Sequence, residues 1–169
     1  MEIRIKKLSD TAVIPELGSA DAAGYDLYAD LGEMIRKHMI APHCTAKIGT
    51  GVAVAIPKGY FGAIFARSGI AAKRGLRPAN CVGVVDSDYR GELIVALHND
   101  SDSMQSISNG ERIAQLVIIP CLNPTILVVE DLDETQRGKG GFGSTGEQHI
   151  VHKDMNDSMN TYGQLSLFS

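Results

Sequence analysis

The chain has 169 residues, 44% of them hydrophobic, with 16 Lys and Arg against 20 Asp and Glu and a formal net charge of −4. These figures predict one domain with a substantial core, exclude wholesale disorder, and argue against a protein that binds nucleic acid directly by neutralising its phosphates. The three cysteines are widely spaced without a C-x-x-C pair, which argues against a disulfide framework or a zinc site and indicates a reducing, cytoplasmic compartment.

Short strands separated by turn residues dominate the chain. The first ten residues lack a signal-peptide core, and Ile3 and Ile5 alternate there with charged residues, as in a strand. Because no later apolar run approaches the ~18 residues of a membrane span, we expect a soluble protein without membrane contact. Further apolar runs predict strands at 52–56, 60–65, 82–85, 93–97, 113–119 and 126–129. Their even spacing predicts an all-β barrel or sandwich.

Two stretches have helical character. Residues 68–75 predict one short helix, with Ser68 as its N-cap and Gly75 as its terminator. Residues 30–37 have a weaker helical pattern.

The composition changes near residue 133. Residues 133–146 are polar and rich in glycine, which loses much backbone entropy on ordering, so they predict a flexible arm that orders on a ligand. We therefore expect a β-barrel core at 1–132, the arm at 133–146 and a disordered tail at 147–169.

The arm contains a formal G-x-G-x-x-G match at residues 138–143. No amphipathic helix follows it, as a dinucleotide site requires, and no Lys follows Gly143, as a P-loop requires. Two interpretations stay open. The arm is either a flexible phosphate wrapper that uses Arg137, Lys139 and the hydroxyls of Ser144 and Thr145, or a solvated linker.

Three further positions allow both a chemical and a structural interpretation. The segment 67–69 joins an apolar strand to the predicted helix and would suit a phosphate or form an ordinary cap. Asp86 follows the strand at 82–85 and is either a general base or a turn-capping residue. Asp26 lies between apolar neighbours and either hydrogen-bonds a turn or serves a metal-bound water.

Five segments together resemble the motifs of the trimeric dUTP diphosphatase (dUTPase) family, in that family's order. They are 22–27 (AAGYDL), 67–69 (RSG), 83–91 (GVVDSDYRG), 110–116 (GERIAQL) and 137–146 (RGKGGFGSTG). The resemblance implies a jelly-roll-like β-barrel and a homotrimer with three shared active sites. It also implies hydrolysis of dUTP to dUMP and diphosphate with Mg²⁺, which would keep uracil out of DNA and supply dUMP for thymidylate synthesis.

The resemblance also implies residue roles. Asp86 would be the general base for a water that attacks the α-phosphate, and Asp26 would hold Mg²⁺ through a water. The hairpin at about 80–89 would recognise uracil, and Tyr89 would lie under the deoxyribose and exclude a 2′-hydroxyl. The implied substrate-binding residues are Arg67, Ser68, Gly69, Asn80, Val85, Tyr89, Gln115, Arg137, Phe142, Gly143, Ser144 and Thr145.

Two other functions are alternatives to this interpretation, and the C-terminal residues indicate a candidate partner. A dCTP deaminase would need another carboxylate arrangement, and a nucleotide-sensing binding protein would not need Asp86. Residues 164–168 (QLSLF) resemble the short peptide by which bacterial proteins dock on the DNA polymerase sliding clamp. This segment is either such a tether or a chance apolar end of a floppy tail.

Overall fold

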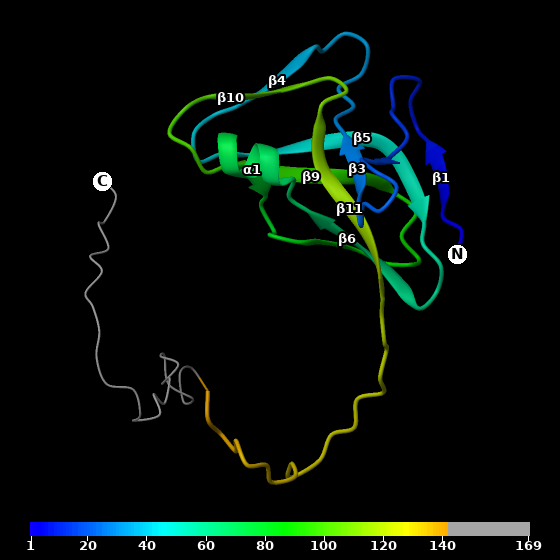
Figure 1. The fold of residues 1–169 in the computed structure, drawn as a ribbon, viewed down its shortest axis with the longest axis vertical. Coiled ribbons are helices and arrows are strands. Elements are labelled where there is room, and N and C mark those ends of the chain that lie inside the picture. Colours follow the sequence, from blue (N-terminus) through cyan, green and yellow to red (C-terminus); the bar gives the residue numbers. More distant parts are fainter. Residues whose placement is uncertain (142–169) are drawn as a thin grey trace, which may run out of the picture. The chain divides into compact units, whose positions relative to one another are not determined.

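Antiparallel β-sheets form the core of the chain, which we describe from a computed structural model covering residues 1–141 (Figure 1). Its elements are β1 (Arg4–Lys7), β2 (Glu16–Leu17), β3 (Tyr25–Tyr28), β4 (Lys37–Ile40), β5 (Thr45–Ala55), β6 (Tyr60–Phe65), α1 (Ser68–Arg74), β7 (Leu76–Pro78), β8 (Gly83–Val85), β9 (Glu92–Asn99), β10 (Gln105–Ser108) and β11 (Arg112–Pro120). A four-stranded sheet has the order β1-β5-β9-β7, a five-stranded sheet has the order β2-β3-β11-β6-β8, and β10 pairs with β4. The all-β class with one short helix is thereby confirmed for the described part of the chain.

The chain divides into two compact units, Met1–Thr125 and Ile126–Ser169, and every strand of the described residues belongs to the first. The boundary expected at residues 132 and 133, with the arm and tail beyond it, stays a prediction. Among the described residues, no helix is both long enough and apolar enough to cross a membrane.

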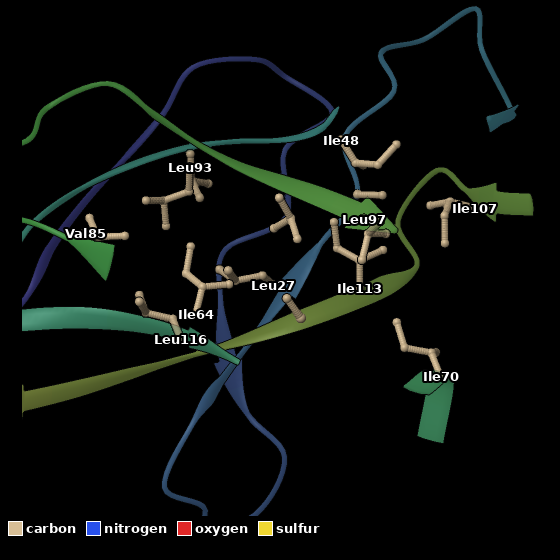
Figure 2. Packing of buried hydrophobic residues seen from close by; sticks show 14 of the residues in the cluster. Leu27, Ile48, Ile64, Ile70, Val85, Leu93, Leu97, Ile107, Ile113 and Leu116 are labelled. Atoms are coloured by element: carbon tan, nitrogen blue, oxygen red, sulfur yellow. The ribbon is translucent and has the colours of Figure 1, made fainter. Parts of the chain in front are cut away.

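Aliphatic side chains from the two larger sheets fill the space between them. The strand predicted at 93–97 forms as part of β9, and its residues alternate between the core and solvent: Leu93, Val95 and Leu97 are at most 2% exposed, whereas Ile94 is 49% exposed. Figure 2 shows Leu93 and Leu97 facing Leu27 and Leu116 of the other sheet. Burying such a side chain stabilises the fold by about 1.5–3 kcal/mol, so this layer holds the two sheets together.

The strand predicted at 126–129 does not form. Ile126, Leu127 and Val128 are 88%, 81% and 91% exposed and join no sheet in the described part of the chain. An apolar run becomes a strand only where another strand supplies hydrogen-bond partners, and residues 1–141 supply none here.

The helix predicted at 30–37 is replaced by a turn that leads into β4. Gly32 has φ +74°, which no helical residue adopts, and its N–H donates to Asp30 Oδ1 at 3.1 Å. An Asp side chain that bonds the following backbone competes with a helix, and here the competition ends in a turn.

Asp30 also fixes the segment that follows β1. Its carboxylate accepts hydrogen bonds from the hydroxyls of Ser9 and Thr11, the latter at 2.6 Å. Burial alone would raise the pKa of Asp30, but these bonds, the Gly32 N–H and the charge of Lys7 outweigh it and lower the pKa below its ordinary value. The ionised carboxylate is therefore the form that stabilises the fold.

We predict that Asp30→Asn destabilises the protein and flattens its acid transition. Since the folded pKa lies below the unfolded value of about 3.9, the stabilisation is present above that value and is lost as the pH falls through the folded pKa. Thermal melts between about pH 7 and pH 2 measure this. Asp10→Asn, an exposed carboxylate of the same segment, is the control. Equal pH profiles for Asp30→Asn and the native chain would contradict the assignment.

Candidate active site

Two clefts in the first unit contain most of the site residues that the sequence predicts. The arginine cleft, about 470 Å³ in volume, contains Asp26, Arg67, Ser68, Gly69 and Gln115. The hairpin cleft, about 210 Å³, contains Asn80, Val85, Asp86 and Tyr89. The structure thus brings the predicted residues together in two separate groups.

Strand pairing builds the arginine cleft. Gln115 of β11 stands opposite Asp26 of β3 on one side and opposite Phe65, the last residue of β6, on the other. The chain leaves β6 directly into Arg67, and the Gln115 side-chain amide donates to the Ala66 carbonyl at 2.9 Å, which holds this exit in place. Three segments that are distant in sequence therefore meet at the end of β6.

Asp26 is a buried carboxylate between two guanidinium groups. It is 7% exposed, and its Oδ1 lies 2.7 Å from Arg67 Nε while its Oδ2 lies 3.2 Å from Arg112 Nη1. Two cations against one carboxylate leave the cleft positive, and guanidinium groups suit phosphate oxygens. Asp26 thus positions both arginines for an anion.

Arg112 is a site residue that the sequence analysis did not assign, although it lies in the quoted segment 110–116. In a regular strand Arg112 and Gln115 would face opposite sides of the sheet, because they are three residues apart. A bulge between Arg112 and Ala114 shifts this alternation, so both side chains line the cleft. The sequence does carry a signal for this bulge: Ile113 and Ala114 are adjacent apolar residues, which a regular alternating strand would not bury together, and both are fully buried.

Ser68 is not the N-cap that the sequence predicted. Arg67 holds that position, with φ −87° and ψ 129°, because its extended backbone continues from β6, and Ser68 is the first helical residue. Within residues 1–141 no side chain caps this end of α1, whereas Gly75 ends the helix as predicted, with φ +66°. Ser68 and Gly69 are exposed and line the cleft, and no atom of the described residues lies within 4 Å of the position a Cβ would take at Gly69.

The hairpin cleft forms where β8 ends. Val85 is 6% exposed and anchors the strand in the core, and the exposed Asp86 follows it directly. The Tyr89 N–H donates to the Asp86 carbonyl at 3.1 Å and closes the turn. Asp86 also lines a neighbouring cavity of about 630 Å³ that contains Lys58 and Arg90, so there is open space on both sides of its carboxylate.

The length of β6 separates the two clefts within one chain. β8 pairs with β6 at Val85 and Gly62, which places Asp86 beside Phe61, and Arg67 follows Phe61 by six residues. At about 3.3 Å per extended residue, Asp86 and Arg67 are roughly 20 Å apart. Groups that act on one phosphorus must lie within hydrogen-bond reach of it, so the two clefts of one chain do not serve the same phosphate.

The remaining predicted residues belong to the second unit. Arg137 lies in an exposed turn, where its Nε donates to the Gly140 carbonyl at 2.9 Å. Phe142, Gly143, Ser144 and Thr145 lie outside the described residues, as does the proposed clamp peptide at 164–168.

Within residues 1–141 no group of three or more His, Cys, Asp or Glu side chains is arranged to hold a metal ion. Asp26 is the carboxylate of the arginine cleft, and both of its oxygens face arginines. These residues therefore do not suit a bare cation. They suit Mg²⁺ that arrives on a phosphate chain and keeps most of its waters, because a single carboxylate can then reach it through water.

Comparisons with known proteins agree on one family. The model of the family described as dUTPase matches residues 10–146. The deoxyuridine 5′-triphosphate nucleotidohydrolase of Syntrophotalea carbinolica is 46% identical, over 85% of this chain and 96% of the relative. That of Escherichia phage T5 is 45% identical, over 84% of this chain and 97% of the relative. A mutant dUTPase of Staphylococcus bacteriophage 80alpha, solved with dUpNHpp, superposes with a TM-score of 0.77 at 32% identity, over 86% of this chain and 98% of that one.

We predict that Arg112→Met weakens the binding of inorganic triphosphate by about tenfold or more, because a hydrogen bond to a charged group contributes about 1.5–3 kcal/mol. Isothermal titration calorimetry measures this. Arg36→Met removes an exposed arginine outside the cleft and is the control. Equal affinities for the two variants would show that Arg112 serves only to pair with Asp26.

Proposed function

The chain belongs to the dUTPase family, and we infer that it is a dUTP diphosphatase. We propose that it cleaves dUTP to dUMP and diphosphate at the α-phosphorus, which keeps uracil out of DNA and supplies dUMP. The observation that carries this proposal is the hairpin cleft, where Asp86 stands beside Asn80 and Tyr89 with open space around its carboxylate.

Asp86 is the general base of the proposed reaction. An Asp86 carboxylate oxygen accepts a proton from a water, the water oxygen forms a bond to the α-phosphorus, and the bond from that phosphorus to the bridging oxygen of diphosphate breaks. Support comes from the way Asp86 is held, with Val85 buried before it and the Tyr89 N–H on its carbonyl. A carboxylate on a fixed turn can aim one water along one direction.

The hairpin cleft selects the nucleoside. Uracil presents an N3–H donor and an O4 acceptor, and main-chain groups of the hairpin cannot rotate to suit cytosine instead. A site of fixed polar groups can reject the wrong base by about 10⁴, because the wrong base leaves those groups unpaired. Asn80 supplies a side-chain amide to the base, Val85 borders the cleft, and Tyr89 lies under the deoxyribose.

The arginine cleft binds the phosphates. Arg67, Ser68, Gly69 and Gln115 contact phosphate oxygens, and Arg112, which lines the same cleft, contacts them too. A Mg²⁺ ion bound to the phosphates would neutralise part of their charge. Asp26 would face that ion through a water while it orients the two arginines.

A homotrimer with shared sites would bring together the two clefts that one chain holds apart. We propose that the hairpin cleft of one subunit and the arginine cleft of another face the same dUTP, so that each site is incomplete without a second copy. The exposed apolar run that includes Ile126, Leu127 and Val128 supports association, since large exposed apolar segments ordinarily contact a partner. The arm, with Arg137, Phe142, Gly143, Ser144 and Thr145, closes over the bound nucleotide, Phe142 stacking on uracil.

We predict that Asp86→Asn lowers kcat for dUTP by roughly three orders of magnitude, because a general base contributes about 10²–10⁴, and leaves the Kd for a non-hydrolysable dUTP analogue within a few-fold. Asp88→Asn, an exposed carboxylate of the same turn, is the matched control and retains turnover. Near-native turnover by Asp86→Asn would refute the assignment of the base. An assay for ammonia released from dCTP separates a deaminase from a hydrolase.

We predict that removing residues 137–169 leaves the assembly intact but lowers dUTP turnover severely, because the arm no longer excludes water from the site. Removing only residues 147–169 keeps the arm and is the control. Size-exclusion chromatography and release of diphosphate measure the two properties. If both truncated proteins kept full turnover, the arm would have no part in the reaction.

A further inference from the structure

Tyr89 is held in one orientation by the residues that follow it. Its side chain belongs to an exposed turn and is among the larger exposed groups of the chain, at 45% exposure. An exposed aromatic ring ordinarily samples several rotamers. Here the Tyr89 hydroxyl donates to the Glu92 carbonyl at 3.0 Å, which ties the tip of the ring to the first residue of β9.

Gly91 provides the space in which the ring lies. A Cβ atom at Gly91 would stand 2.6 Å from Tyr89 Cζ and 3.0 Å from Cε2, and would meet the hydroxyl oxygen more closely still. Gly91 is not among the residues with positive φ, so its backbone accepts alanine. The glycine is required for the position of the ring and not for the path of the chain.

The Glu92 carbonyl is itself fixed to the barrel. The Glu92 carboxylate accepts the Gly51 N–H at 2.8 Å, in the part of β5 where the pairing with β9 shifts register between Gly49 and Ala53. Arg90 Nη1 donates to the carbonyls of Ser87 and Tyr89, both at 2.7 Å, and tightens the turn. The Tyr89 ring is therefore fixed relative to β5 and β9, although it lies on a surface turn.

We propose that Gly91 and the Glu92 carbonyl form a seat for the Tyr89 ring, and that Gly91 is a positioning residue for selection against a 2′-hydroxyl. This inference rests on the proposed function, in which Tyr89 lies under the deoxyribose. A ribonucleotide differs from a deoxyribonucleotide by one oxygen atom at C2′, so a steric wall rejects it only if the wall is held in place. The seat holds it.

The test compares Gly91→Ala, Tyr89→Ala and the double variant in the full-length protein, by kcat/KM for dUTP and for UTP. Gly91→Ala moves the flexible end of one side chain, so the expected result is a Tm near the native value and a dUTP/UTP preference reduced by about tenfold. Tyr89→Ala reduces the preference at least as much. The double variant matches Tyr89→Ala, because without the ring there is nothing for the added methyl to displace.

The possible failures are distinguishable. An unchanged preference in Gly91→Ala beside a reduced one in Tyr89→Ala would overturn the seat and leave the sugar gate standing. An unchanged preference in Tyr89→Ala would overturn the gate, and the seat with it, while dUTP turnover itself persists. If the dUTP/UTP preference of the double variant were about tenfold below that of Tyr89→Ala, Gly91 would act without the ring, and the seat would be overturned. If Gly91→Ala does not fold, Tyr89→Phe, which lacks only the bond to Glu92, is expected to lower the preference a few-fold, and no change would overturn the seat.

Discussion

The length of β6 separates Asp86 from Arg67, and the proposed chemistry needs both residues at one phosphate chain. β6 pairs with β8 near Asp86 and with β11 along its length, and it ends two residues before Arg67, so main-chain hydrogen bonds hold these two groups apart. No rotation of side chains closes a gap of roughly 20 Å. If the enzyme uses both groups on one phosphate, the second group has to come from another copy of the chain. The sharing of sites is then a consequence of strand pairing.

Each cleft is positioned by a departure from regular structure. In the arginine cleft, a bulge in β11 places Arg112 on the side of Gln115, and Asp26 holds Arg112 and Arg67 by its two oxygens. In the hairpin cleft, the Glu92 carboxylate accepts the Gly51 N–H at the irregular part of β5, and the Glu92 main-chain carbonyl accepts the Tyr89 hydroxyl. In both places a carboxylate that does no chemistry fixes the groups that contact substrate in the proposed reaction.

The sequence predicted the parts of the molecule that local rules govern. The apolar run at 93–97 identified β9, and Gly75 marked the end of α1 because it adopts the positive φ that glycine favours. The motif resemblance selected Asp86 and Asp26, each of which lines a cleft. Patterns could not reveal what depends on a partner strand. The run at 126–129 stays exposed because no described strand pairs with it, and the Asp30 carboxylate that bonds the Gly32 N–H is itself held by distant Ser9 and Thr11.

Mixing two inactive variants tests the shared site most directly. Asp86→Asn lacks the base of the hairpin cleft, and an Arg67→Ala variant lacks a cation of the arginine cleft. If each site joins the two clefts of different subunits, equal amounts unfolded and refolded together regain turnover, because about a quarter of the sites in random trimers then contain both native residues. Each variant refolded alone stays inactive. A mixture that is no more active than its separate components, although mixed assemblies have formed, would contradict the account.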